Sequence, residues 1–420
     1  MHPREGGRRQ AASFLIAAVV GLAAAGAYAP GAAADGAGRL FLPALLQEGI
    51  PAPPVIASPG RGIYLDPIVV SLSTSNPEAT IFYTTDGRVP TPDTGLVYRG
   101  PFPVAGTTVL RAVAILPRRP PSATLTQTYV FPADTVRQPR KPPGLPRSWG
   151  FTGDGDIVEA DYEMDRRVAV ADPRYRDRIV SDLMSLPSVS VVTRPADMFA
   201  PEGIYSNPTE AGRPWERPAS VELIYPSGKP GFQVDCGIRI AGDYSRDPEA
   251  NRKHSFSLRF RKEYGAEKLR YPLFPDSSVE VFDALRLRAG QADSFEFFPR
   301  KAQYIHDQWG RDTQRAMGSP AAHGEFVHLY VNGLYWGLYN LAQEVDAEFA
   351  AQTYGGHKDD YDVIKQDIDL GPRVEHGDKT AFEAMLAIDD LGSPEGWAEI
   401  QEYLDVVQYV DYTILEFYGA

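Results

Sequence analysis

The sequence predicts an α+β protein in which a small all-β domain precedes a larger domain of mixed strands and helices. Two observations support this division. Before residue 131, short β-branched runs recur at hairpin-like spacing between clusters of Gly, Pro, Asp and Asn, as in a β-sandwich. After residue 150, strand patterns and amphipathic helical patterns are mixed, and helices dominate the end of the chain. A chain of 420 residues has room for two or three domains.

The N-terminus has the pattern of a secretory signal peptide. Three arginines precede an apolar run over residues 11–29, and small residues then offer a cleavage site. We therefore expect residues 1–34 to be a signal peptide, residues 35–51 to be a lead-in, and the protein to be secreted, that is, extracytoplasmic. A single membrane anchor is the alternative, but the run is short and rich in Ala and Gly for a spanning helix. Sec and Tat export both stay open.

Composition excludes some classes of function. The formal net charge is −13, and no block of Lys and Arg is dense enough for a face that binds nucleic acid. Cys236 is the only cysteine, so an internal disulfide and a cysteine-based metal site are both excluded. Because Cys236 lies in an alternating apolar run, we expect it to be buried in a strand rather than to act as a nucleophile.

The small β domain is expected over residues 52–131. Its predicted strands are residues 68–72, 80–84, 107–114 and 124–131. Asp86-Gly87 is typical of a tight turn. Residues 132–150 form a Pro-rich linker, because prolines interrupt helices and favour extended backbone. Trp149, near the end of this linker, is expected to dock on the next domain.

Several blocks of the β domain resemble the chitobiase/β-hexosaminidase C-terminal-type module. They are Tyr83-Thr84-Thr85-Asp86-Gly87, Gly100-Pro101-Phe102 and Leu110-Arg111-Ala112. The resemblance implies an accessory immunoglobulin-like sandwich, for which a rigid adaptor is the simplest role. An alternative role is contact with the cell wall or with carbohydrate through residues 52–131. This role needs exposed aromatic rings, for which Tyr83 and Tyr98 are candidates, but such rings more often belong to the core of a sandwich. Glycoside hydrolysis needs a carboxylate pair that the sequence does not place.

The large domain is expected over residues 151–420. Strands are predicted at residues 188–192, 219–225, 232–241, 253–260 and 284–288, and Asn332-Gly333 predicts a hairpin between 326–330 and 335–341. Helices are predicted at residues 174–185, 303–317, 345–354, 379–389 and 395–418, the last with a break near Asp405.

This order of elements is typical of the part of a protein kinase that binds ATP. There a loop covers the phosphates, a lysine on the next strand holds them, a helix carboxylate orients the lysine, and a hairpin leads to the hinge. Concentrated negative charge requires fixed positive charge and N–H donors. The residues in these places are Gly242 and Arg246 in the loop, Lys253 on the strand, Asp307 and Asp312 on the helix, and Glu344 after the hairpin.

The pattern alone leaves these roles open. A lysine at a strand edge and an aspartate on a helix are more often solvated charges. The sequence contains neither a P-loop nor the H-R-D and D-F-G motifs.

Several blocks from about residue 185 to the end of the chain are similar to the CotH (spore coat protein H) kinase-like family. Among them are Trp215-Glu216-Arg217-Pro218, Lys253-His254-Ser255-Phe256, Leu285-Arg286-Leu287-Arg288, Tyr335-Trp336-Gly337 and Asp360-Tyr361-Asp362. The resemblance implies an atypical protein-kinase-like fold that binds ATP with Mg²⁺ and phosphorylates protein Ser or Thr. It gives Lys253 the place of the basic strand residue, Glu344 that of the acidic residue after the hairpin, and Asp307 that of the helix carboxylate.

The family continues into a segment rich in Asn, Asp and Trp that supplies its catalytic aspartate and metal ligands. The resemblance therefore implies that the catalytic Asp follows Ala420, that no catalytic residue or metal ligand lies within the chain, and that this incomplete domain has weak or no activity by itself. The expected function is an exported CotH-like kinase. The alternative is a non-catalytic cell-surface or spore-surface scaffold, or a carbohydrate-associated adhesive protein.

Overall fold

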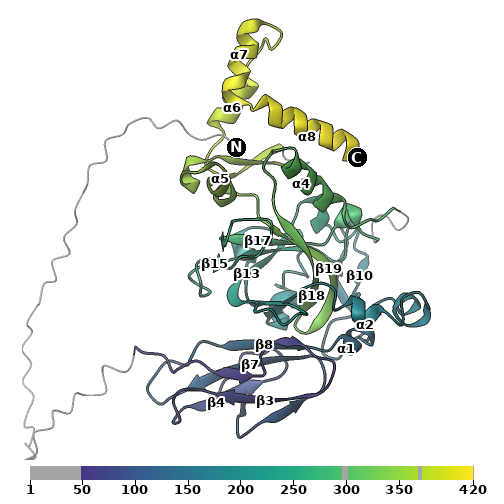
Figure 1. Cartoon of the computed structure of the whole chain (residues 1–420), viewed down its shortest axis with the longest axis vertical. Helices are drawn as coiled ribbons and strands as arrows, with labels where there is room; N and C mark the ends of the chain where they lie inside the picture. Colours follow the sequence, from purple (N-terminus) through teal and green to yellow (C-terminus); the bar gives the residue numbers. More distant parts are fainter. Residues whose placement is uncertain (1–48, 296–300, 368–370, 420) are drawn as a thin grey trace, which may run out of the picture.

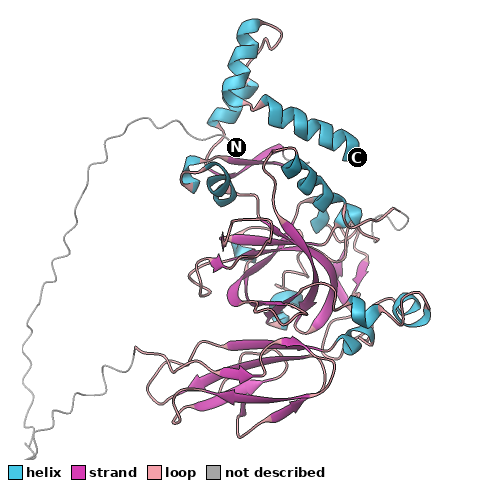
Figure 2. Ribbon diagram, viewed as in Figure 1, coloured by secondary structure: helices cyan, strands magenta, loops and turns pink. Residues whose placement is uncertain are grey.

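The structure is a computed structural model that describes residues 49–295, 301–367 and 371–419. Figures 1 and 2 show a β-sheet domain at one end, a β-barrel in the middle and helices at the other end. The predicted signal peptide lies outside the described residues. In the described part of the chain, no helix is both long and apolar enough to cross a lipid bilayer.

The N-terminal domain consists of two sheets around a shared core, which is compatible with the predicted sandwich. The strand orders are β1-β3-β6 and β2-β8-β7-β4-β5. Residues of both sheets fill the core, among them Val70, Leu110 and Tyr129. The strands are β1 (Ile56–Ser58), β2 (Gly62–Ile63), β3 (Ile68–Ser73), β4 (Thr80–Thr84), β5 (Leu96–Val97), β6 (Phe102–Val104), β7 (Thr108–Ile115) and β8 (Leu125–Val130).

Tyr83 and Tyr98 belong to an aromatic cluster of this domain. The ring of Tyr83 stacks on Phe102 with centroids 4.7 Å apart, and Tyr98 meets Phe102 edge-on at 6.4 Å. All three side chains pack against the core. Both tyrosine rings are therefore engaged in packing within the domain rather than displayed as a flat platform.

The larger domain is built on a closed barrel with the strand order β11-β12-β13-β14-β17-β19-β18. Neighbouring strands are antiparallel except β11 and β18, which are parallel. The strands are β11 (Ser188–Thr193), β12 (Arg217–Ile224), β13 (Gln233–Ala241), β14 (Ser255–Arg259), β17 (Ala284–Arg288), β18 (Gly324–Val331) and β19 (Leu334–Gln343). The predicted strands are present, but this barrel does not confirm the expected kinase-like fold.

The predicted hairpin turn joins β18 to β19. Asn332 and Gly333 have φ angles of 49° and 80°. Two consecutive residues with positive φ suit the twist of a two-residue hairpin, and Asn followed by Gly adopts them at least cost.

Alternate residues of the barrel strands form the main core. In β14, Phe256 and Leu258 belong to this core, and in β17 so does Leu287. Ser257 and Arg286, which alternate with them, lie on the outer surface of the barrel because successive side chains of a strand point to opposite faces. Cys236 is buried within the core, and burial raises the pKa of its thiol, so the expectation of a buried strand cysteine is confirmed.

The segment between the two domains packs against the barrel. Helix α1 (Pro132–Val136) begins there, although the prolines had predicted extended backbone; Pro132 is tolerated because the first helical position needs no N–H partner. Trp149 is 2% exposed, and its ring lies 5.3 Å from Tyr205 and 5.2 Å from Trp336. The expected docking of Trp149 on the next domain is confirmed.

The other elements surround the barrel, and the later helices lie at its end away from the sandwich, with α6 and α7 projecting outward (Figure 1). Short elements are β9 (Ser148–Phe151), β10 (Ile157–Glu159), α2 (Ile179–Asp182), α3 (Pro195–Phe199), β15 (Leu269–Arg270), β16 (Val281–Phe282), β20 (Val363–Asp367) and β21 (Gly371–His376). The later helices are α4 (His306–Ala316), α5 (Ala347–Tyr354), α6 (Thr380–Leu386), α7 (Pro394–Tyr403) and α8 (Val406–Gly419).

The helices predicted at residues 303–317, 345–354 and 379–389 are present as α4, α5 and α6. The helix predicted at 174–185 is reduced to α2, because of its apolar positions only Leu183 is buried and short helices depend on packing. The break predicted near Asp405 separates α7 from α8.

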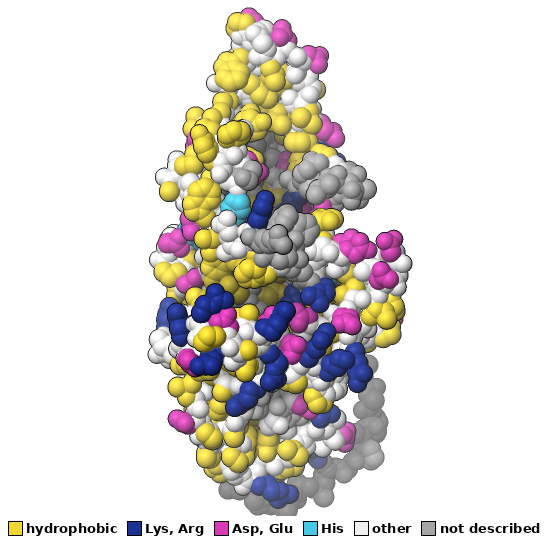
Figure 3. Space-filling model, turned by 90° about the vertical axis from the view of Figure 1, so that its right-hand side faces the viewer, with side chains coloured by type: hydrophobic (Ala, Val, Ile, Leu, Met, Phe, Trp, Pro, Cys, Tyr) yellow, Lys and Arg dark blue, Asp and Glu magenta, His cyan; other side chains and the backbone are white. Residues whose placement is uncertain are grey.

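The surface between the domains carries charges of both signs. Figure 3 shows Lys and Arg side chains interspersed with Asp and Glu across the middle of one face. Several exposed arginines of the chain pair with neighbouring carboxylates: Arg137 with Asp134, Arg140 with Glu159, and Arg167 with Asp165. Such exposed pairs contribute little free energy.

The sandwich docks on the outer face of β11 and β12 through a buried polar network. Glu222 of β12 is fully buried, and its carboxylate accepts hydrogen bonds from the backbone N–H and the hydroxyl of Thr128 in β8. The Thr128 hydroxyl also lies 2.7 Å from that of Ser190 in β11, and Arg61 Nε lies 3.4 Å from Glu222. A carboxylate that is buried away from solvent therefore joins the two domains.

We expect Glu222→Gln to remove a pH dependence of stability. Burial raises the pKa of Glu222 to about 7 against the opposing effect of Arg61 and Thr128. The unfolded chain releases this proton from about pH 4.5, so the wild-type free energy of unfolding falls between about pH 4.5 and 7. The fall is on the order of 3 kcal/mol, and the variant lacks it because glutamine does not titrate.

Urea unfolding across this pH range measures the effect. The exposed Glu280→Gln is the matched control and should keep the wild-type pH dependence. Parallel wild-type and Glu222→Gln curves would contradict the prediction.

Candidate functional site

A row of polar side chains crosses the outer face of strands β13, β14 and β17. Arg239 pairs in register with Ser257, and Ser257 pairs with Arg286. Arg259 lies two residues beyond Ser257 and so on the same face of β14. All four line a cavity of about 310 Å³, which we call the arginine pocket.

Three more cations reach the arginine pocket from outside the barrel. Arg246 comes from the loop after β13, and Lys365 and Arg373 come from the hairpin β20–β21. Six cationic side chains thus line the pocket, against two carboxylates, Asp243 and Glu375. Such an excess of positive charge suits a ligand with several negative charges.

Glu344, directly after β19, anchors this cluster of charges. Arg286 donates from Nε to Glu344 Oε2 at 2.8 Å and from Nη2 to Oε1, while Lys365 Nζ lies 3.3 Å from Oε1. Burial by itself would raise the pKa of Glu344, but Arg286, Arg259 and Lys365 outweigh it and lower the pKa to about 2. The carboxylate is therefore ionised at neutral pH and holds its cations in place.

Two buried polar atoms of the arginine pocket, Ser257 Oγ and Arg259 Nε, have no hydrogen-bond partner among the described residues. Ser257 is 1% exposed and stands between Arg239 and Arg286 in the register of the sheet. Because buried polar groups are nearly always satisfied, such atoms mark the place of a ligand, an ion or ordered water.

The cations of the pocket repel one another. Burial, followed by repulsion from Arg239, Arg286 and Arg373, lowers the pKa of Arg246 to about 10. Burial and the neighbouring Arg259 likewise lower the pKa of Arg239. An anion in the pocket would relieve this repulsion, so the charges favour an occupied state.

Gly242 shapes the loop that borders the pocket. Its φ angle is 114°, and a Cβ at this position would collide with Ser245 Oγ, so only glycine fits. Arg246 Nε donates to the Gly242 carbonyl at 2.5 Å, and its Nη1 donates to the Glu210 carbonyl at 2.9 Å. The structure thus brings both predicted loop residues, Gly242 and Arg246, to the arginine pocket.

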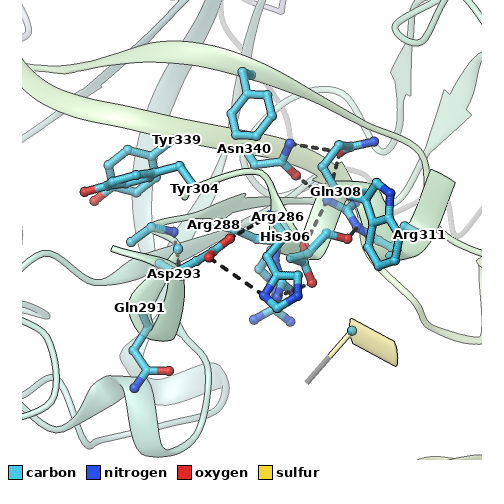
Figure 4. A pocket seen from close by; sticks show the side chains of 18 of the residues that line it. Arg286, Arg288, Gln291, Asp293, Tyr304, His306, Gln308, Arg311, Tyr339 and Asn340 are labelled. Atoms are coloured by element: carbon cyan, nitrogen blue, oxygen red, sulfur yellow. Dashed lines mark hydrogen bonds and ion pairs between the residues drawn. The ribbon is translucent and has the colours of Figure 1, made fainter. Parts of the chain in front are cut away.

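A larger cavity of about 600 Å³, drawn in Figure 4, adjoins the arginine pocket. Gly242 and Arg286 line both cavities. Asp307 of α4 lies in this larger cavity and pairs with Arg288 at 2.8 Å and with Arg311 at 3.0 Å. Arg311 also donates to the Asn340 side chain. Asp307 therefore orients two arginines, and Asp312 pairs with Arg315.

Lys253 lies apart from the other predicted residues. It precedes β14, which begins only at Ser255, and it lines a third cavity whose lining includes neither Glu344 nor Asp307. Its Nζ is 5.8 Å from the ring centroid of Trp336, a cation–π contact. The cations beside Glu344 are Arg286 and Lys365.

Sequence reasoning missed most cations of the pocket, although a signal was present. Arg239 alternates with isoleucines in β13, and Arg286 alternates with leucines in β17. This pattern predicts arginines on the polar face of each strand. It does not predict that the two arginines share a row, because the register between distant strands depends on the whole barrel.

Metal-ligating side chains do not gather among the residues that the structure describes. No group of three or more His, Cys, Asp or Glu side chains is placed among them to hold an ion.

Comparison with protein families matches two regions of the chain. The structure is that of a protein with two domains, a sandwich and a barrel. The barrel carries a cationic pocket that is a candidate site for an anion. The family described as CotH kinase protein matches residues 238–419, and the chitobiase/beta-hexosaminidase C-terminal domain matches residues 59–126. Both resemblances are thereby confirmed, and the chain carries a CotH-family region behind a chitobiase-type module. No curated protein matches the chain.

Glu344→Gln should destabilise the protein at neutral pH. It removes the negative charge that faces Arg286, Arg259 and Lys365, and loss of one partner from a buried ion pair costs about 3–5 kcal/mol. Urea unfolding measures the loss. The control is Glu375→Gln, whose partner Arg373 is exposed, and it should cost no more than about 1 kcal/mol. Equal losses in the two variants would show that Glu344 is not the anchor.

Proposed function

We propose that the arginine pocket binds the phosphates of ATP, and that the protein is an exported CotH-type kinase that phosphorylates Ser or Thr of a protein substrate. One observation carries the proposal: the unsatisfied buried atoms Ser257 Oγ and Arg259 Nε lie in a pocket lined by six cationic side chains. The match of residues 238–419 to the CotH kinase family supports the same function.

The chemistry of the pocket suits a phosphate chain. Guanidinium groups bind phosphate oxygens through two parallel N–H donors, and each such bond is charge-assisted. Glu344 holds Arg286 and Lys365 before any ligand arrives, so little entropy is lost when they bind it. In phosphoryl transfer, catalysis depends mainly on positioning and on neutralising the charge of the phosphates.

The loop and the larger cavity beside the arginine pocket have positions that fit this proposal. The loop at Gly242 and Arg246 borders the phosphates, as a covering loop does in kinases. The larger cavity, which meets the pocket at Gly242 and Arg286, provides room for the nucleoside or for the acceptor hydroxyl. None of the described residues is assigned the part of catalytic base.

A non-catalytic scaffold on the cell surface is the second candidate. It is favoured by the docked sandwich, whose buried Glu222 network makes the module a rigid arm of the barrel. In that case the arginine pocket would hold an anionic group of the surface without preference for a nucleotide.

Two lysines of the chain allow a matched test. We expect Lys365→Met to weaken the binding of ATP about tenfold, because it removes one charge-assisted hydrogen bond from the phosphates. Lys253→Met should change the affinity less than about twofold, since Lys253 lines another cavity. Isothermal titration of the full chain with ATP and with inorganic tripolyphosphate measures both.

The outcomes separate the candidate functions. A larger loss for Lys253→Met than for Lys365→Met would return the phosphate role to Lys253. Equal affinity of the wild type for ATP and tripolyphosphate would favour the scaffold, and no binding of either would reject the pocket as a phosphate site.

A further inference from the structure

A cavity of about 540 Å³ lies at the joint between the sandwich and the barrel, and it shares no lining residue with the arginine pocket. We call it the joint cavity. Val89 and Arg111 line it from the sandwich, and Ser220 and Asp235 line it from strands β12 and β13. Val89 and Glu263, which also line it, are exposed, so the joint cavity opens to solvent.

Arg111 is a buried cation with few partners. It is 8% exposed, and its only hydrogen bond to a described residue is a long one of 3.5 Å from Nη1 to the Gly87 carbonyl. Its Nε, fully buried, has no partner in the described part of the chain. A buried guanidinium ordinarily makes several hydrogen bonds, so Arg111 has donors to spare where it borders the joint cavity.

Asp235 faces the same space from the barrel. Its carboxylate accepts a hydrogen bond from Gln233 Nε2 at 3.3 Å and lies beside Ser220, its register partner in β12. Among the described residues no ion pair joins Asp235 to Arg111, although both line the joint cavity. Arg111, which can only donate hydrogen bonds, and the Asp235 carboxylate, which accepts them, thus line the same cavity without a hydrogen bond between them.

We propose that the joint cavity binds a neutral polyhydroxylated ligand, namely a sugar unit held between Arg111 and Asp235. A sugar hydroxyl accepts a hydrogen bond from a guanidinium and donates one to a carboxylate, so a vicinal diol bridges the two side chains. The lining carries both signs of charge, with Arg111 and Arg194 against Asp197, Asp235 and Glu263, so a neutral ligand with donors and acceptors suits it better than an ion of either sign.

The size and the apolar lining of the joint cavity fit this ligand. Val192 and Ala219 border it with small apolar surfaces, which suit the C–H faces of a sugar ring. A water molecule occupies about 30 Å³, so the cavity is far larger than a single bridging water requires. The proposal does not rest on nucleotide binding, because the two cavities have separate linings.

Saturation-transfer NMR on the full chain tests the proposal with glucose, mannose, N-acetylglucosamine and cellobiose as probes. We expect at least one probe to bind saturably, and Asp235→Asn to weaken it about tenfold or more, because the ligand loses a hydrogen bond to a charged acceptor. Arg111→Met should weaken it similarly. Arg99→Met, at an exposed arginine of the sandwich that does not line the cavity, should leave the affinity unchanged.

The result that overturns the proposal is a folded wild type that binds none of the four probes, or equal affinities of wild type and Asp235→Asn. Asp235→Asn keeps the size of the side chain, so it gives an answer even where Arg111→Met fails to fold. Binding of a monosaccharide would indicate a free sugar as ligand, and binding of cellobiose alone would indicate a unit within a glycan. ATP titration of Asp235→Asn should match the wild type, which separates this site from the arginine pocket.

Discussion

Closure of the seven-stranded barrel decides where the polar residues of its strands can lie. Inside a closed barrel of this size there is room only for packed side chains, so alternate positions are apolar and the residues between them lie outside. Two outer faces then become buried in different ways. The sandwich covers β11 and β12, whereas a loop and the hairpin β20–β21 border β13, β14 and β17. Closure of the barrel thus accounts for both the arginine pocket and the contact between the two domains.

Two buried glutamates on these faces show how the surroundings set the charge. Glu344 has Arg286, Arg259 and Lys365 beside it, and their attraction exceeds the penalty of burial, so its pKa falls to about 2. Glu222 has a weaker set of partners, with Arg61 as its nearest cation, and burial dominates, so its pKa rises to about 7. The number of adjacent cations therefore distinguishes a fixed anion from a titrating one. Only the former can organise a site for a charged ligand at neutral pH.

Local patterns predicted the strands, the Asn332-Gly333 turn and the loop that contains Gly242 and Arg246, because each depends on short stretches of sequence. The strand predicted to begin at Lys253 begins at Ser255 in the structure, and Lys253 lies in the bend before it, near Trp336. Register between strands distant in sequence, which aligns the arginine row, depends on closure of the whole barrel. The burial of Glu222 could not be predicted either. A polar residue that alternates with apolar ones in a strand is expected to face solvent, and the sequence does not show that another domain covers this face.

Strand β13 connects the two proposed ligand sites. Asp235 lines the joint cavity and Arg239 lines the arginine pocket, four residues further along the same face, which is about 13 Å in a strand. Between them, Gly237 leaves room for Glu216 and Tyr264, which a Cβ at this position would strike. These packed side chains separate the cavities, and a barrel strand bonded on both sides resists bending. The geometry therefore favours two ligands held at a fixed spacing over a conformational signal passed from one site to the other.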